Sequence, residues 1–200
     1  MKIEILKATL LNTNNYLITH KNTTLLIEAS VSLEELKKHT LNLDAIFLTH
    51  LHWDHYIHLQ EIIEFYHCPV YFRKEGYDKL KNSNQATFYL DKKFNCTIEN
   101  NAIRFLEESP VTIKEITITP CFTNGHTNCG CCYKIENYLF SGDTMFKGTY
   151  GRCDLPTSSL SDMINSIKKL LTLPEETIVY PGHGLQTTLK EEKETYSNLI

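Results

Sequence analysis

Four of the chain's nine histidines fall within residues 49–58, the stretch THLHWDHYIH. Neutral imidazoles, together with the carboxylate of Asp54, are ligands suited to zinc, iron or manganese. His50 and His52 are two positions apart, so they cannot share a helix face, but at the end of a strand both can reach one ion. Asp54 and His55 lie just beyond them and indicate a second ion.

Three more histidine or aspartate residues follow β-type runs farther along the chain. His126 stands in FTNGHTN, Asp143 in YLFSGDT and His183 in IVYPGHG, each in a glycine-containing turn. Sites are often built from loops on one rim of a rigid scaffold, so we expect these three residues to gather with the first cluster. Seven candidate ligands are too many for one tetrahedral centre, whereas two ions that share a bridging carboxylate would use them all.

The elements that would position these residues come in two batches of strands, each closed by helices. Strand-type patterns are expected at 2–11, 15–29 (a hairpin turning at 21–23), 43–50, 69–72, 96–123, 131–140 and 177–182. Helices are expected at 32–39 (opened by the capping box of Ser32 and Glu35), 57–66, 158–171 and 188–196, while 73–95 is polar and helical at best. This order suits two packed sheets with helices outside, although it also fits a general α/β fold.

Composition narrows the function classes. The formal net charge is -4 and basic residues occur at most in pairs, so nucleic acid is not expected as a partner. No stretch approaches the roughly 20 apolar residues of a membrane span, and the first residues do not resemble a signal peptide. The seven cysteines are odd in number and irregularly spaced, which favours reduced thiols and a cytoplasmic protein. One domain over residues 1–200 is expected; the sequence leaves the oligomeric state open.

The ordered set of motifs resembles the metallo-β-lactamase-fold hydrolases, and within them the small glyoxalase II-like enzymes. The resemblance rests on H-x-H-x-D-H at 50–55, GHT at 125–127, SGDTMF at 141–146, GTYGRCDLP at 148–156 and PGHG at 181–184. It covers nearly the whole chain, from NNYLI at 14–18 to the expected C-terminal helix. The fold that it implies is an α/β, four-layer αββα sandwich with the site at one edge, in agreement with the two batches of strands.

The resemblance also implies a role for each candidate ligand. One ion would be held by His50, His52 and His126, a second by Asp54, His55 and His183, and Asp143 would bridge them. The implied cofactor is a pair of divalent ions, zinc above all, with iron or manganese as alternatives.

The implied activity is hydrolysis of a small-molecule thioester of the hydroxyacyl-glutathione type. A hydroxide between the two ions would attack the acyl carbon, and Asp54 would orient it, which makes Asp54 the candidate catalytic residue. Full-length glyoxalase II enzymes carry a further helical region that helps to grip glutathione, whereas this chain ends soon after PGHG. Another thioester or a lactone therefore remains open as the substrate.

Two other function classes fit parts of the pattern. A mononuclear iron oxidoreductase of the persulfide dioxygenase type shares the implied fold and a similar GRxD loop. It would use ligands of the type of His50, His126 and Asp143 and dispense with the second metal. A catalytically silent binding module is disfavoured because all seven ligand positions are filled.

Several residues near the motifs allow two interpretations. Lys147, Tyr150 and Arg152 are candidate substrate contacts, although an ion pair between Arg152 and Asp154 that fixes their loop is favoured. His58 stands in a segment where the family usually has small residues, and we interpret it as a surface residue at a helix start.

Further departures from the family pattern concern cysteines and one acidic residue. The cysteines at 129, 131 and 132 are interpreted as buried apolar residues, because adjacent strand positions face opposite ways and cannot all bind one ion; a reactive thiol is the alternative. Glu28 replaces the family's usual aspartate, so any supporting role there is open.

Overall fold

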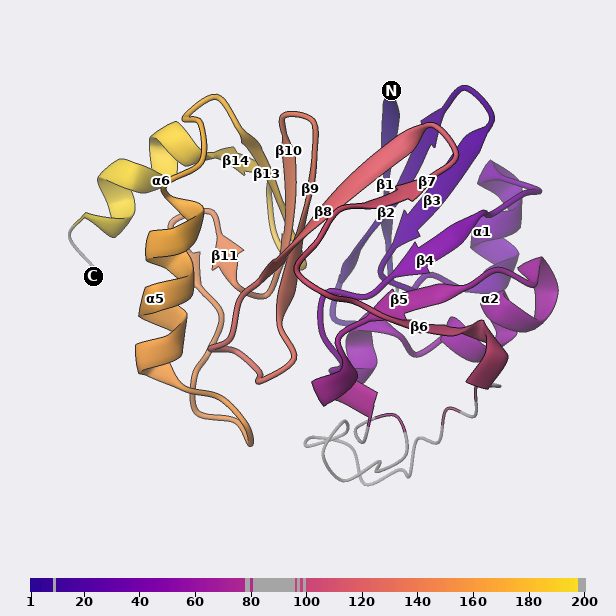
Figure 1. Ribbon diagram of the computed structural model, residues 1–200, viewed down its shortest axis with the longest axis horizontal. Coiled ribbons are helices and arrows are strands. Elements are labelled where there is room, and N and C mark those ends of the chain that lie inside the picture. Colours follow the sequence, from indigo (N-terminus) through magenta and orange to yellow (C-terminus); the bar gives the residue numbers. More distant parts are fainter. Residues whose placement is uncertain (9, 78–79, 81–95, 97, 99, 198–200) are drawn as a thin grey trace.

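A computed structural model of the chain describes residues 1–8, 10–77, 80, 96, 98 and 100–197. Within these residues most strands form two six-stranded sheets that pack face to face, with helices on both outer faces (Figure 1). This arrangement confirms the predicted αββα sandwich. None of the helices in the described part of the chain has the length and apolar character needed to cross a membrane.

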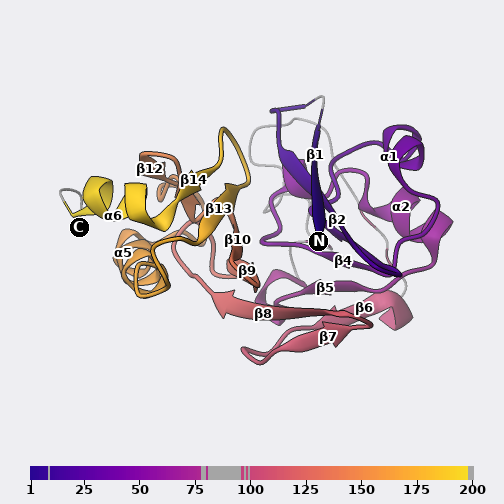
Figure 2. The same cartoon turned by 90° about the horizontal axis from the view of Figure 1, so that it is seen from above.

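The first sheet starts with antiparallel strands and continues with parallel ones. In spatial order it contains β1 (Lys2–Lys7), β2 (Asn14–His20), β3 (Thr23–Ile27), β4 (Ala45–Phe47), β5 (Val70–Phe72) and β6 (Ile103–Phe105). Seen from above, helices α1 (Leu33–His39) and α2 (Leu59–Tyr66) lie on its outer side (Figure 2). The Ser32 hydroxyl accepts a hydrogen bond from the Glu35 backbone N–H at 3.2 Å, which confirms the predicted helix start.

The second sheet is mostly antiparallel, with one parallel pair, β10 and β13. In spatial order it contains β14 (Thr187–Thr188), β13 (Ile178–Pro181), β10 (Tyr138–Gly142), β9 (Cys131–Ile135), β8 (Ile116–Phe122) and β7 (Val111–Ile113). Its outer face is covered by α5 (Leu160–Leu170) and α6 (Leu189–Tyr196) (Figures 1 and 2). A separate hairpin of β11 (Met145–Phe146) and β12 (Thr149–Tyr150) lies beside this sheet, and short 3-10 turns span Trp53–His55, Lys74–Gly76 and Asn100–Ala102.

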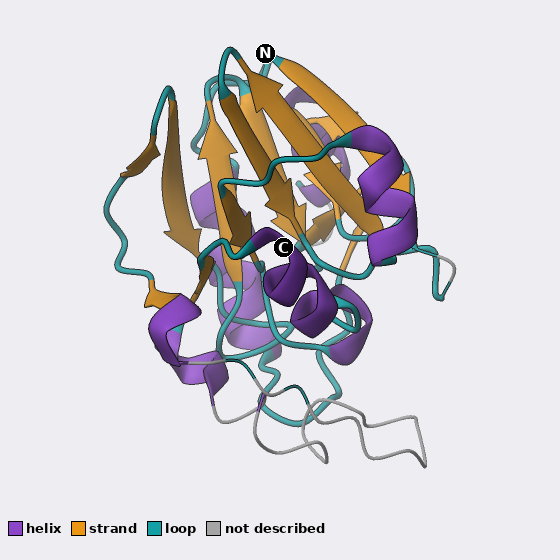
Figure 3. Ribbon diagram, turned by 90° about the vertical axis from the view of Figure 1, so that its right-hand side faces the viewer, coloured by secondary structure: helices purple, strands orange, loops and turns teal. Residues whose placement is uncertain are grey.

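Three apolar cores lie between the layers of helices and strands, which are purple and orange in Figure 3. The core between the sheets is rich in aromatic rings, such as Tyr16 against Phe140 and Phe47 against Tyr133, with ring centroids 5.1 and 5.3 Å apart. Edge-to-face aromatic pairs of this kind add to the stability that burial of apolar surface provides. The site-bearing loops therefore emerge from a rigid double sheet.

The clustered cysteines are divided among these cores. Cys129 lies in the core beneath α1 and α2, Cys131 between the sheets, and Cys132 beneath α5 and α6. All seven cysteines of the chain are free thiols, and burial raises the pKa of Cys132 to about 12. The prediction that these adjacent cysteines face different ways is confirmed.

Several predicted boundaries differ from the structure. Helix α2 begins at Leu59 rather than at residue 57, because residues 53–55 form a 3-10 turn and Tyr56 leaves helical geometry at φ -143°. The strand expected at 2–11 ends at Lys7, and Leu11 and Asn12 form a turn with φ of +54°. The two-residue strands β11, β12 and β14 were not predicted, since so short a run carries no periodicity. Most of the segment 73–95, expected to be helical at best, lies outside the described residues.

Candidate metal centre

The seven predicted ligands all lie just after the ends of strands. His50 to His55 follow β4, His126 follows β8, Asp143 follows β10 and His183 follows β13. Strands β10 and β13 are parallel neighbours, which brings the last two of these loops side by side. The double sheet thus gathers residues that are more than 130 positions apart in the sequence at one edge.

His50, His52 and His126 form the first of two compact groups. The Nδ1 atom of His52 lies 3.1 Å from Nε2 of His50 and 2.9 Å from Nε2 of His126. One nitrogen from each ring therefore points to a shared centre, and the three atoms lie within 4.8 Å of one another. Three imidazoles with an open side are a ligand set that catalytic zinc sites use.

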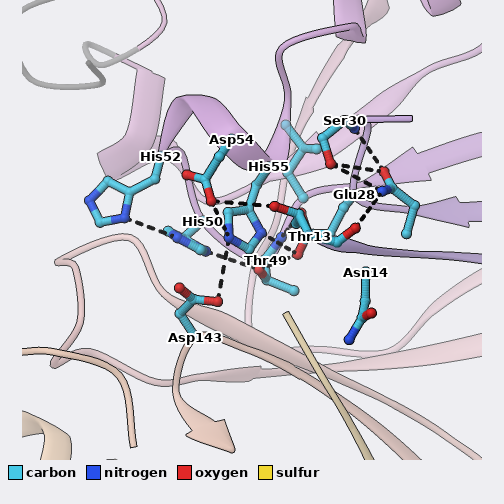
Figure 4. Close-up of polar contacts among 12 residues, drawn as sticks. Thr13, Asn14, Glu28, Ser30, Thr49, His50, His52, Asp54, His55 and Asp143 are labelled. Carbon is cyan, nitrogen blue, oxygen red and sulfur yellow. Dashed lines mark hydrogen bonds and ion pairs between the residues drawn. The ribbon is translucent and has the colours of Figure 1, made fainter. Parts of the chain in front are cut away.

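Asp54, His55 and His183 form the second group. Oδ2 of Asp54 lies 3.3 Å from Nε2 of His183. The same oxygen lies 3.5 Å from Nε2 of His55 (Figure 4). Their ligand atoms also lie within 4.8 Å of one another. A second centre with mixed nitrogen and oxygen ligands therefore adjoins the first.

Asp143 stands between the two groups. Its Oδ1 atom lies 3.4 Å from Nε2 of His55 in the second group. Its Oδ2 atom lies 3.5 Å from Nε2 of His126 in the first group and 3.6 Å from Nε2 of His183 in the second. This carboxylate is consequently within reach of both centres, as its predicted bridging role requires.

Backbone carbonyls orient two of the imidazoles. Nδ1 of His126 lies 2.8 Å from the carbonyl oxygen of Arg152, and Nδ1 of His183 lies 3.2 Å from that of Leu11. A carbonyl can only accept a hydrogen bond, so each Nδ1 carries the proton and each Nε2 keeps its lone pair for the site. Metal-binding histidines are usually held in this way.

Glu28 supports one imidazole from each group. It is 1% exposed, its Oε1 atom lies 3.3 Å from Nδ1 of His55, and it accepts a short hydrogen bond from the Thr49 hydroxyl (Figure 4). That hydroxyl in turn lies 3.1 Å from Nδ1 of His50. The buried carboxylate of Glu28 thus contacts Nδ1 of His55 directly. It reaches Nδ1 of His50 through the hydroxyl of Thr49.

Glycine allows the close approach of the loops around these residues. A Cβ atom on Gly182 would lie 2.2 Å from Oδ1 of Asp143 and 2.8 Å from Cε1 of His55. A Cβ atom on Gly142, where φ is +51°, would lie 2.2 Å from the hydroxyl oxygen of Thr49. Only glycine fits at these two positions without displacing a ligand or the residue that supports one.

The electrostatics of the cluster suit a cation. Burial would raise the pKa of Asp143, but the neighbouring His55, His126 and His183 hold it well below its ordinary value. Burial would lower the pKa of His55, yet Asp54, Asp143 and Glu28 raise it well above the usual range. Within the described residues, Nε2 of His55 and Oδ1 of Asp143 are buried without a hydrogen-bond partner. Unpaired buried polar atoms are costly, and a divalent ion would satisfy both.

The predicted substrate contacts each have a partner within the chain. Arg152 forms a two-pronged ion pair with Asp154 at 2.6 and 2.7 Å, which confirms the predicted pair. Nζ of Lys147 lies 3.6 Å from Glu191, and the ring of Tyr150 stacks on that of Tyr196. A role for Lys147, Tyr150 and Arg152 in binding substrate stays a prediction.

Of the other residues near the site, one was predicted and several were missed. His58 lies directly before α2, as expected, and its Nδ1 atom is 2.7 Å from Glu61. The supporting contacts of Thr49, Leu11 and Arg152 were missed, since a lone threonine or a backbone carbonyl leaves no motif. Arg73 was also missed: its buried guanidinium donates to Asn124 and to the Gly130 carbonyl, and so holds the loop that carries His126.

Comparisons with known proteins point to one family. The model of the metallo-beta-lactamase superfamily matches residues 8–183. A probable metallo-hydrolase of Streptococcus pyogenes is 31% identical over 90% of this chain and 82% of its own length. A hydroxyacylglutathione hydrolase of Tolumonas auensis is 31% identical over 86% of this chain, which spans only 57% of that enzyme.

Solved structures agree with the family match. The crystal structure of BLEG-1, a B3 metallo-beta-lactamase, superposes with a TM-score of 0.89 at 27% identity and covers 96% of this chain and 97% of its own. The di-iron-bound form of TTHA1623 gives a TM-score of 0.86 at 29% identity and covers 96% and 98%. The chain therefore belongs to the metallo-beta-lactamase superfamily, a family of metal-dependent hydrolases.

Proposed function

We propose that this protein is a dinuclear metal hydrolase that cleaves a thioester of the hydroxyacyl-glutathione type. The observation that carries the proposal is the position of Asp143 between the two ligand groups. Each of its two oxygens lies within 3.6 Å of a candidate ligand, and the contacted ligands belong to both groups. His50, His52 and His126 would hold one ion, and Asp54, His55 and His183 the other. Zinc suits the imidazole-rich first group, while the di-iron form of TTHA1623 supports iron as an alternative.

Two bound divalent ions would supply a hydroxide at neutral pH, because they lower the pKa of water to about 7, and would polarise the acyl oxygen. Asp54 would orient that hydroxide for its attack on the acyl carbon. Burial would raise the pKa of Asp54, but His55 and His183 keep it below its ordinary value, so the group is a carboxylate at neutral pH. The Thr13 hydroxyl, 3.4 Å from Oδ2 of Asp54, helps to hold it in place (Figure 4).

A thioester fits this arrangement better than an ester or an amide. A thiol has a pKa of about 8.5, so the thiolate can leave without a strong general acid. The polar loop with Lys147, Tyr150 and Arg152 begins four positions after Asp143 and would meet the anionic thiol portion of the substrate. The similarity to a hydroxyacylglutathione hydrolase supports this substrate class, with other thioesters and lactones as the alternatives.

The protein as purified should release free thiol from S-lactoylglutathione and should consume no oxygen with glutathione persulfide. Thiol release and an oxygen electrode measure the two reactions on the same sample. Oxygen uptake without thioester cleavage would contradict the proposal and favour the persulfide dioxygenase class. Cleavage of a lactone alone would keep the metal hydrolase but overturn the thioester.

A further inference from the structure

Three exposed leucines lie in the two loops that meet at His183. Leu10 and Leu11 are 43% and 59% exposed in the loop between β1 and β2, and Leu185, two positions after His183, is 74% exposed. The two loops are tied together: the Leu11 carbonyl meets His183 Nδ1 at 3.2 Å, and Asn14 donates to the Gly184 carbonyl at 3.2 Å. These three leucines, hereafter the apolar rim, therefore lie in loops that adjoin the second ligand group.

The backbone of Leu11 makes leucine an unexpected choice there. Its φ is +54°, as is that of Asn12, which places both residues in the left-handed region. A bulky side chain is an outlier in that region, whereas asparagine or glycine is favoured. Because the side chain is mostly exposed, it contributes little to the core that would offset the strain. Unfavourable backbone of this kind tends to persist where function requires the side chain.

The surroundings of the two ligand groups differ in chemistry. The carbonyl that orients His126 belongs to Arg152, whose guanidinium pairs with Asp154 in a charged loop. The carbonyl that orients His183 belongs to Leu11 in the apolar rim. A substrate that extends from the charged loop across the centre to the rim would be polar at one end and apolar at the other.

We propose that the apolar rim of Leu10, Leu11 and Leu185 binds a linear aliphatic acyl group, so that the enzyme prefers thioesters of medium-length acyl chains. This inference rests on the proposed function and specifies its substrate. The polar thiol portion lies toward Arg152, and the acyl chain lies over Leu11 beside His183.

A series of straight-chain N-acetylcysteamine thioesters, from acetyl to octanoyl, tests the acyl preference. The value of kcat/KM should rise about twofold for each added methylene, roughly half the gain that full burial of a methylene would give. A matched series with a fixed acetyl group and S-alkyl thiols of increasing length should show no such rise. A flat acyl series, or a rise with the thiol chain instead, would overturn the inference.

Leu11→Asn separates a substrate contact from a structural one. Asparagine tolerates the left-handed backbone, so Tm should rise by about 2–4 °C. The octanoyl-to-acetyl ratio of kcat/KM should fall about fivefold, as apolar contact area is lost. Leu41→Asn is the control, because Leu41 is 76% exposed outside the rim and should leave the ratio unchanged. A ratio unaffected by Leu11→Asn would contradict the inference.

Binding of products makes the inference independent of turnover. Metal-loaded protein should bind octanoate more tightly than acetate in calorimetry, and Leu11→Asn should remove most of the difference. If no thioester is cleaved, the proposed function is wrong. The comparison of octanoate with acetate binding still tests whether the apolar rim binds an aliphatic chain. If thioesters are cleaved but octanoate and acetate bind equally, the rim inference alone is wrong.

Discussion

Replacing Asp143 with alanine should abolish binding of both metal ions, and with it hydrolysis. Asp143 lies within 3.6 Å of members of both groups, so its loss removes a ligand from each centre at once. It would also leave the imidazoles of His55, His126 and His183 without the charge that they now surround. Elemental analysis of the purified variant, expressed as ions per chain, measures the result.

Asp154→Ala provides the control for this experiment. Asp154 is an exposed carboxylate of a nearby loop that pairs with Arg152 rather than standing among the predicted ligands. That variant should retain the full complement of metal. Loss of only one ion from Asp143→Ala would mean that Asp143 does not bridge the two centres. The assignment of the other six residues to two ligand groups would not be affected.

Glu28→Gln should weaken metal binding about 10- to 100-fold, the range found when partners that orient metal ligands are changed. The carboxylate of Glu28 can only accept, so it favours a proton on Nδ1 of His55 and a free lone pair on Nε2. An amide in its place can donate to Nδ1, which would favour the other tautomer and block Nε2. Competition with a chelator of known affinity measures the change.

Glu192→Gln is the matched control. Glu192 is likewise 1% exposed, but it accepts from the Gly148 backbone and from Thr187, at the junction of α6 and the β11–β12 hairpin. Its replacement should lower thermal stability and leave metal affinity unchanged. Equal losses of metal affinity in both variants would mean that Glu28 acts only through general stability.

The candidate ligands and the strands before them could be predicted from this sequence because they follow apolar runs, and because His126, Asp143 and His183 also lie next to glycines. The layer order also followed from two batches of strands closed by helices. What the sequence could not give are contacts made by backbone atoms, such as the carbonyls of Leu11 and Arg152, since any residue can supply them. The support from Glu28 through Thr49 depends on the packing of β3 against β4, which no local motif encodes.

The start of α2 shows a second limit of sequence patterns. The apolar periodicity extends back to Ile57, but folding of His55 into the site forces a tight 3-10 turn before the helix can begin at Leu59. Tertiary constraints at a functional site therefore override the local preference. The same holds for Leu11, whose left-handed backbone contradicts its residue type.

The number of metal ions per chain tests the central claim most directly. Protein purified without added metal should contain about two divalent ions per chain, and removal of both with a chelator should abolish thioester cleavage until metal is restored. One iron per chain, with oxygen consumed in the presence of glutathione persulfide, would contradict the dinuclear hydrolase.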